Sequence, residues 1–179
     1  MDNIATAVRR ARVSDTPALT DLVNRAFEVE RFFIDGQRTT ADEIDQLIQS
    51  GGFLVLEYEH GICAAILYRG PGEQPGQPPS HAYLGMLSVL PELQGMGLGR
   101  RLVQVAEAMA EATGATSMNL RVVNLREELS RWYRSLGYRE VGTTPFNYHL
   151  LKRPCHFIEM EKTLAPASPV YAASEIGAA

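Results

Sequence analysis

The segment ELQGMGLGRRL, residues 92–102, decides the fold of this chain, because it places three glycines at alternate positions directly before a helical pattern. Glycine inside a regular element is less favourable than alanine by roughly 0.5–1 kcal/mol, so such a run is typical of backbone that closely approaches another group. A largely apolar stretch, residues 82–89, precedes it. A helix N-terminus without Cβ atoms in the way is a binding site for anions. The segment therefore predicts a strand, an anion-binding turn and a helix.

Patterns on both sides of this segment predict the remaining elements. Residues 7–13 indicate a short strand, and Ser14 and Asp15 offer N-cap oxygens to an amphipathic helix that begins near Pro17. Thr40 and Glu43 match a capping box that opens a second helix through residue 50. Further strands are predicted at residues 53–58, 62–68, 82–89, 117–123, 139–143 and 155–162, with a last helix at 127–136 and a Pro- and Gly-rich loop at 70–80.

This order of elements, β-α-α-β-β-β-α-β-α-β-β, predicts the fold class. Hairpin-like neighbours early in the chain and a strand–helix–strand crossover in the middle favour an α/β (α+β mixed) fold, with a mixed and mostly antiparallel sheet covered by helices on both faces. Residues 1–164 are expected to form one domain. Residues 165–179 are small and rich in alanine, which predicts a flexible tail.

The composition excludes several classes of function. The 179 residues are 45% hydrophobic and 21% charged, typical of one globular domain, and the net charge of −4 gives no reason to expect nucleic acid as a partner. No apolar run approaches the roughly 20 residues that cross a bilayer. Two cysteines and four histidines show no metal-ligand spacing, so no metal is expected. The sequence is thus interpreted as a cytoplasmic protein with no membrane partner.

Two well-known phosphate-binding motifs fail to match the glycine run. A P-loop requires Gly-Lys-Ser/Thr at its end, which is absent. A dinucleotide fingerprint requires a third glycine three residues after Gly97, where Arg100 stands, and it follows the first strand of a parallel sheet. A tight turn without any ligand remains an alternative on the motif alone.

A third motif, Gln/Arg-x-x-Gly-x-Gly/Ala, fits at every fixed position. The residues are Gln94, Gly95, Met96, Gly97, Leu98 and Gly99. They resemble the coenzyme-A pyrophosphate loop of the GCN5-related N-acetyltransferases, the GNAT family. LSVLP before the loop (residues 87–91) and RWYRSLGY after it (131–138) are similar to further motifs of that family. The resemblance covers roughly residues 7–163.

The resemblance implies a cofactor site. In this family the sheet splays between its fourth and fifth strands, and the pantetheine arm of acetyl-CoA enters the gap, where its amides meet otherwise unpaired backbone. One N–H near Leu87 could also polarise the thioester carbonyl. Arg100 and Arg101 either add charge at the phosphates or are solvated residues of the first turn. The implied cofactor-binding residues are Leu87, Ser88, Val89, Gln94, Gly95, Met96, Gly97, Leu98, Gly99 and Arg100.

Tyr133 matches the family tyrosine that donates a hydrogen bond or a proton to the departing coenzyme-A sulfur. Its alternative role is a core aromatic residue beside Trp132. Full proton transfer from tyrosine to a thiolate is uphill by roughly 2 kcal/mol at the ordinary pKa values, so stabilisation of the thiolate is expected first. Many relatives carry asparagine seven residues before this tyrosine; here the position is Arg126, a candidate donor to the cofactor.

The acceptor side is less defined by the sequence. Tyr83 stands where some relatives have a glutamate that assists the amine, so the base is unassigned, with His81, Glu57, Glu30 and His156 as candidates that are equally surface or packing residues. Phe32, Phe33 and Tyr83 are candidate substrate contacts. The small negative net charge slightly favours a basic acceptor.

The resemblance thus implies an acetyl-CoA-dependent N-acetyltransferase that moves an acetyl group to an amine by direct attack in a ternary complex. The expected partner is a small-molecule or peptide amine, and a homodimer is implied only by the family. The alternative is a non-catalytic acyl-CoA-binding or regulatory domain, which the missing glutamate favours and Tyr133 disfavours.

Overall fold

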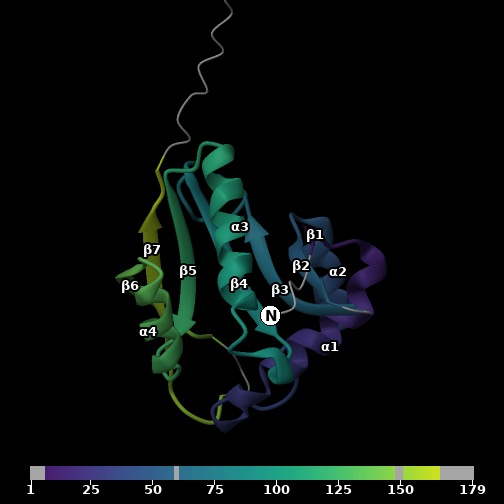
Figure 1. Cartoon of the computed structure of the whole chain (residues 1–179). Coiled ribbons are helices and arrows are strands. Elements are labelled where there is room, and N and C mark those ends of the chain that lie inside the picture. The colour runs from purple at the N-terminus through teal and green to yellow at the C-terminus, as the bar shows by residue number, and fades with distance from the viewer. Residues whose placement is uncertain (1–6, 59–60, 148–150, 166–179) are drawn as a thin grey trace, which may run out of the picture.

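The computed structural model describes residues 7–58, 61–147 and 151–165, and within these ranges the chain forms a seven-stranded sheet between helices (Figure 1). The strand order is β1-β2-β3-β4-β5-β7-β6, and only β4 and β5 run parallel. The strands are β1 (Val8–Arg10), β2 (Phe53–Tyr58), β3 (Gly61–Arg69), β4 (His81–Val89), β5 (Ser117–Val123), β6 (Arg139–Pro145) and β7 (His156–Thr163). The helices are α1 (Thr16–Ala26), α2 (Ala41–Gln49), α3 (Leu98–Ala112) and α4 (Glu127–Ser135), with 3-10 turns η1 (Val13–Asp15), η2 (Glu28–Phe32) and η3 (Pro91–Leu93).

Alternation along the strands gives the sheet two apolar faces. Leu54 and Leu56 of β2 point into a core shared with α3 and α4, whereas Phe53 and Val55 point to the opposite face, beneath α1 and α2. Figure 1 shows α3 lying across one face of the sheet and α1 and α2 beyond its other face. The helices therefore cover both faces near β2 to β4, as the sequence predicts.

A third apolar cluster ties two long connections together. Phe33 and Ile34, after η2, pack with Val123 at the end of β5 and with Phe146 after β6. The backbone N–H of Lys152 donates to the carbonyl of Phe33 at 2.8 Å. The connection between α1 and α2 is thus joined to the connection between β6 and β7.

The pairing of β4 with β5 stops early. Only three pairs join them, the last being Tyr83 with Asn119, although β4 stays paired with β3 up to Val89 and β5 stays paired with β7 to its end. A β-bulge in β4 at Met86, whose φ is +46°, interrupts the ladder to β3 just beyond this point. The two parallel strands consequently part over the second half of β4.

The predicted fold class is confirmed, and most predicted elements differ from the observed ones by one or two residues. The predicted role of Asp15 is wrong. Its carboxylate makes no cap bond to α1, because it accepts from the Arg9 guanidinium at 2.7 and 3.1 Å and from the Arg12 N–H at 2.7 Å. Residues 166–179 of the predicted tail, 165–179, lie outside the described residues.

The capping box of α2 is formed as predicted and can be tested. Thr40 Oγ1 accepts from the Glu43 N–H at 3.3 Å, and Glu43 Oε2 accepts from the Thr40 N–H at 3.1 Å. Replacing Thr40→Ala leaves an N–H of the first turn without its partner, so we expect a loss of about 1 kcal/mol in the free energy of unfolding. Urea denaturation measures this as a lower midpoint at constant slope; an unchanged midpoint would contradict it.

Candidate functional site

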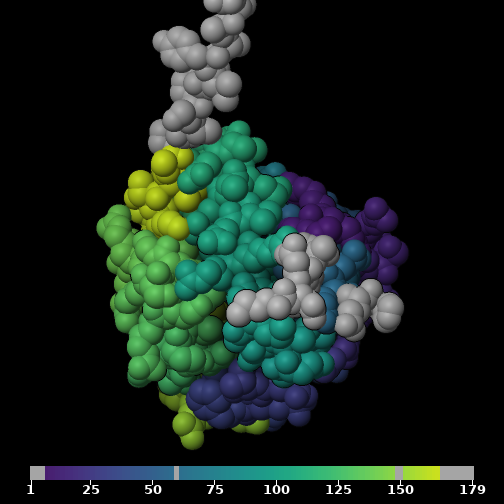
Figure 2. Space-filling view, viewed as in Figure 1, coloured from purple at the N-terminus to yellow at the C-terminus, as the bar shows by residue number. Residues whose placement is uncertain are grey.

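A cavity of about 570 Å³ opens where β4 parts from β5, between the second half of β4, the glycine turn and α4. In Figure 2 these segments reach the surface as teal atoms in the centre and green atoms at the left, with the indigo connection that follows α1 below. Nine of the residues predicted to bind the cofactor line it: Leu87, Val89, Gln94, Gly95, Gly97, Leu98, Gly99, Arg100 and Arg126.

Two predicted residues do not line this cavity. Ser88 is fully buried, and its hydroxyl donates to the carbonyl of Met86 at 3.0 Å, which fixes the bulge. Met96 is 53% exposed and does not contribute to the lining. Any contact that Ser88 makes with a ligand is therefore restricted to its backbone.

The glycines of the turn have two different roles. Gly95 and Gly97 have φ of +81° and +83°, and a Cβ atom built on either would meet nothing within 4 Å, so space lies open above the turn. Gly97 is also the N-cap of α3, whose first N–H groups have no partner within the helix. Gly99, in contrast, packs closely: its Cβ would lie 3.5 Å from Leu87 and 3.8 Å from Trp132. The turn at residues 95–97 thus exposes backbone N–H donors to open space.

One face of α4 forms the opposite wall, and most of its residues were not predicted from the sequence. Arg126, Leu129 and Trp132 recur at three-residue steps and therefore share one side of the helix. This spacing was a usable signal. Phe27, at the end of α1, carries no comparable signal, because only the tertiary fold brings it to the cavity.

Tyr133 lies on α4 beside this wall but is not itself part of the lining. It is 5% exposed, with its ring centroid 4.8 Å from that of Trp132 and 5.6 Å from that of Tyr138. Burial, assisted by the nearby Tyr83, raises the pKa of Tyr133 well above its usual range. Its hydroxyl consequently stays protonated at neutral pH.

Arg126 is held by two carboxylates. It lies 3.1 Å from Glu30 Oε1 and also pairs with Glu128. The Glu30 side chain is only 7% exposed, and this burial raises the pKa of Glu30 although Arg38 and Arg126 oppose the shift. Arg126 thus brings η2 of the α1–α2 connection against the start of α4.

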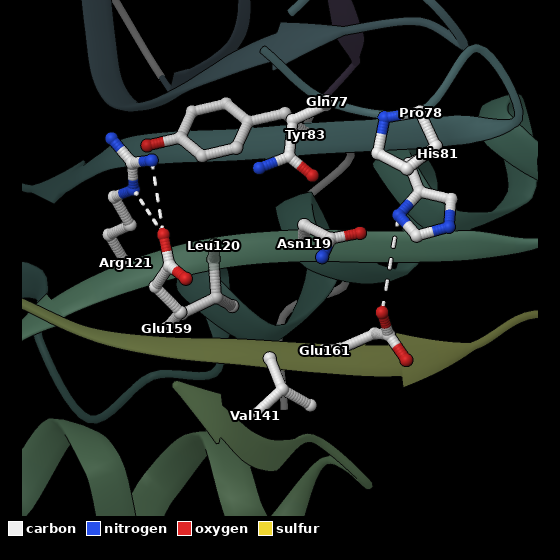
Figure 3. A pocket seen from close by; sticks show the side chains of 10 residues that line it. All are labelled: Gln77, Pro78, His81, Tyr83, Asn119, Leu120, Arg121, Val141, Glu159 and Glu161. Carbon is white, nitrogen blue, oxygen red and sulfur yellow. Dashed lines mark hydrogen bonds and ion pairs between the residues drawn. The ribbon is translucent and has the colours of Figure 1, made fainter. Parts of the chain in front are cut away.

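Tyr83 lies on the other face of the sheet, in a polar pocket of about 160 Å³ (Figure 3). Its ring extends over Gly85, where an added Cβ would lie only 3.1 Å from the ring and from the hydroxyl. Arg121 and Glu159 pair beside it at 3.1 Å, and His81 Nδ1 lies 4.0 Å from Glu161. Glycine at position 85 therefore allows the tyrosine to extend along β4 toward the bulge.

The predicted substrate residues and bases have mixed outcomes. The prediction for Phe33 is corrected, since its side chain is fully buried in the third cluster and has no surface to offer a substrate. Phe32 is 44% exposed, with Arg153 over its ring. Glu57 is paired with Arg9 on β1, away from the cavity.

Among the described residues, no cluster of His, Cys, Asp and Glu could hold a metal, and none of the helices is long and apolar enough to span a membrane.

Comparison with known proteins gives the family. The sequence profile of the acetyltransferase (GNAT) family matches residues 16–138. The S-alkylcysteine N-acetyltransferase of Bacillus subtilis (strain 168) is 29% identical over 136 residues, which cover 73% of this chain and 76% of that protein.

Solved structures agree in fold. The ribosomal-protein-S18-alanine N-acetyltransferase of Escherichia coli has a TM-score of 0.72 at 17% identity, over 92% of this chain and 97% of that chain. The protein yncA of Salmonella typhimurium, solved with acetyl-CoA, has a TM-score of 0.71 at 20% identity, over 92% and 98%. At these identities the likeness concerns the fold alone.

The chain belongs to the GNAT family of acetyltransferases. Members of this family transfer the acetyl group of acetyl-CoA to amines of small molecules or proteins, so acetyl-CoA is the co-substrate here. Two features of the cavity fit acetyl-CoA. One is the open glycine turn at a helix N-terminus, and the other is the edge of β4 beyond the end of its pairing with β5.

A substitution at Gly97 tests whether the glycine turn binds coenzyme A. We expect Gly97→Ala to weaken binding of coenzyme A about tenfold, because a methyl group enters the open space and alanine is strained at positive φ. Calorimetry measures the affinity. Gly114→Ala is the matched control, since Gly114 has φ of +84°, equally open surroundings and a position at the far end of α3. Equal affinities for both variants would contradict the assignment.

Proposed function

We propose that this chain acetylates an amine by direct attack on acetyl-CoA, with both substrates bound at once. The observation that carries the proposal is the parting of β4 from β5 beyond Tyr83 and Asn119, next to the cavity. Backbone groups at such an edge require hydrogen-bond partners, and the amides of a pantetheine arm supply them. No covalent enzyme intermediate is needed, because burial raises the pKa of both Cys63 and Cys155 and so disfavours a reactive thiolate.

The binding roles follow from the lining of the cavity. The backbones of Leu87, Ser88 and Val89 bind the pantetheine arm, and the N–H groups of residues 94–100 bind the pyrophosphate. Arg126 adds a cation that Glu30 and Glu128 keep in position. Trp132 and Leu129 supply apolar contact area along the same wall.

The backbone at the bulge is proposed to stabilise the negative charge that forms on the thioester oxygen. Met86 and Leu87 have no paired residue on β3, whereas Gly85 and Ser88 on either side of them do. In the proposed complex the N–H of Leu87, a residue that lines the cavity, polarises the thioester carbonyl and stabilises the oxyanion as it forms. Removing one such donor commonly lowers kcat by about 10²–10³.

Tyr133 stabilises the departing sulfur by donating a hydrogen bond. At the ordinary pKa values, complete transfer of its proton to the thiolate is uphill by roughly 2 kcal/mol. Burial raises the pKa of Tyr133 further and makes that transfer less favourable still. A hydrogen bond to the developing thiolate, with protonation by solvent afterwards, suits this environment.

The acceptor amine must lose a proton before it attacks. A lysine-like amine with a pKa of about 10.4 is almost wholly protonated at neutral pH, whereas an α-amine has a lower pKa and presents its neutral form at a smaller cost. We therefore propose an α-amine acceptor that needs no dedicated base. The name of the Bacillus subtilis relative gives S-alkylcysteine as its acceptor, so S-methyl-L-cysteine belongs at the head of any acceptor panel.

Release of free thiol from acetyl-CoA, followed with a thiol reagent against a panel of amines, tests the proposed function. The proposal expects amine-dependent release together with an N-acetylated product identified by mass spectrometry. Tight binding of coenzyme A with no release for any acceptor would favour the non-catalytic alternative.

We expect Tyr133→Phe to lower kcat about 10²-fold, with little change in the KM for acetyl-CoA, because the lost donor acts mainly in the transition state. Tyr138→Phe is the matched control. It also removes the hydroxyl of a buried tyrosine beside α4, but that hydroxyl donates to Glu107 at 2.8 Å. The control should lose stability and keep its kcat; full activity of Tyr133→Phe would remove this role of the tyrosine.

The raised pKa of Tyr133 also fixes a pH dependence. A donor must be protonated, and a tyrosine whose pKa lies above its ordinary value of about 10 stays protonated throughout the neutral and mildly alkaline range. We expect kcat/KM to rise as the acceptor amine deprotonates and to show no descending limb below about pH 10. A descending limb near pH 8–9 that disappears in Tyr133→Phe would contradict this.

A further inference from the structure

A second cavity, of about 560 Å³, lies on the face of the sheet that carries α1 and α2. Its lining includes Leu47 of α2, Arg69 of β3 and Met86 of β4, together with Arg38 and Thr39 just before α2. Met86 is the bulge residue, and its neighbour Leu87 lines the cavity assigned to the cofactor. The two cavities thus approach the bulge from opposite faces of the sheet.

Arg38 has unsatisfied donor capacity. Its Nε is buried and has no hydrogen-bond partner among the described residues. It forms a long ion pair with Glu30, whose Oε2 is 4.0 Å away, beyond hydrogen-bond distance. The guanidinium lies 5.0 Å from the ring centroid of Phe27, which holds its plane in place.

Arg69 forms no ion pair with a described acidic side chain. Its hydrogen bonds go to neutral oxygens, the carbonyl of Ser50 at 3.3 Å, the hydroxyl of Ser50 at 3.4 Å and the carbonyl of Glu73 at 3.5 Å. Within the described part of the chain, no carboxylate lies within 4.0 Å of it. Two guanidinium groups therefore line one cavity, and the one acidic group near them, Glu30 at 4.0 Å from Arg38, is also bound to Arg126.

The acidic groups nearby are engaged elsewhere. The Glu43 carboxylate also lines the cavity, but it accepts from the Thr40 N–H at 3.1 Å and from Thr39 Oγ1 at 3.0 Å in the capping box. Glu30 binds Arg126 at 3.1 Å and lies farther from Arg38, at 4.0 Å. Arg121, the other cation on this face near Tyr83, is already paired with Glu159 at 3.1 Å.

We propose that this cavity binds the carboxylate of the acceptor, and that the acceptor is a free amino acid with an apolar side chain. The inference rests on the proposed function, because only an acceptor needs a site that meets the bulge from the face opposite the cofactor. Arg38 and Arg69 bind the carboxylate, while Leu47 and Met86 contact the apolar side chain. The volume suits a small ligand.

The local charge thus reverses the expectation from the whole chain. A net charge of −4 slightly favours a basic acceptor, since it acts on diffusing ligands at long range. At contact distance the two guanidinium groups favour an acceptor with a negative charge, because a partly buried charge is screened much less than a surface charge. A polyamine would place further positive charge against Arg38 and Arg69.

Two acceptors that differ only in the carboxylate test the proposal. L-methionine and 3-(methylsulfanyl)propylamine are compared by thiol release, at equal concentrations of the unprotonated amine so that their different pKa values do not contribute. We expect kcat/KM to be about tenfold or more higher for the amino acid. Equal values, or a preference for the simple amine or for a methionine-initiated peptide amide, would overturn the proposal.

Variants locate the effect in the cavity. Arg38→Gln and Arg69→Gln should each reduce the selectivity ratio about tenfold. Arg134→Gln is the matched control, because Arg134 is an exposed arginine on α4 paired with Glu140. Calorimetric affinity for coenzyme A checks that each variant is folded. An unchanged ratio in both Arg38→Gln and Arg69→Gln would overturn the assignment.

Failure of the proposed function is distinguishable from failure of this inference. If no amine releases thiol, the proposed function fails, and the protein with coenzyme A bound is titrated with L-methionine by calorimetry. Binding that is weakened in Arg38→Gln but not in Arg134→Gln would still support the carboxylate site. Absence of binding would overturn it.

Discussion

The bulge at Met86 and the end of the β4–β5 ladder at Tyr83 form the constraint on which the site depends. Backbone groups buried in a sheet need partners, and β4 loses its partner on one side while it keeps β3 on the other. The buried Ser88 hydroxyl fixes the bulge by donating to Met86. If the β4–β5 ladder continued, the two strands would pair along their length and leave no gap next to the cavity.

The same bulge separates two environments. On the side of α3 and α4, an open glycine turn and the apolar face of α4 surround a cavity that suits a long molecule ending in phosphates. On the side of α1 and α2, Arg38 and Arg69 face a second cavity. The reaction that we propose joins the two substrates at their common boundary, and direct transfer requires just such a meeting point.

Local patterns predicted the elements well, because their signals lie within a few residues. The capping box at Thr40 and the alternation in β2 are of this kind, and both are present. The prediction for Asp15 was wrong because two other donors, the Arg9 guanidinium on β1 and the Arg12 N–H of the preceding turn, bind its carboxylate. Phe33 failed likewise: nothing near it in the sequence reveals that Phe146 will cover it.

The sequence by itself determined the order of strands and helices, the glycine turn ahead of α3 and the resemblance to acetyltransferases, since each depends on spacing along the chain. Only the tertiary structure decided which residues surround the two cavities. Arg38, Arg69 and Met86 come from three separate elements, and their juxtaposition depends on how the helices pack on the sheet. The charge at a site is set by the side chains within a few ångströms of it, so the net charge of the whole chain does not predict it.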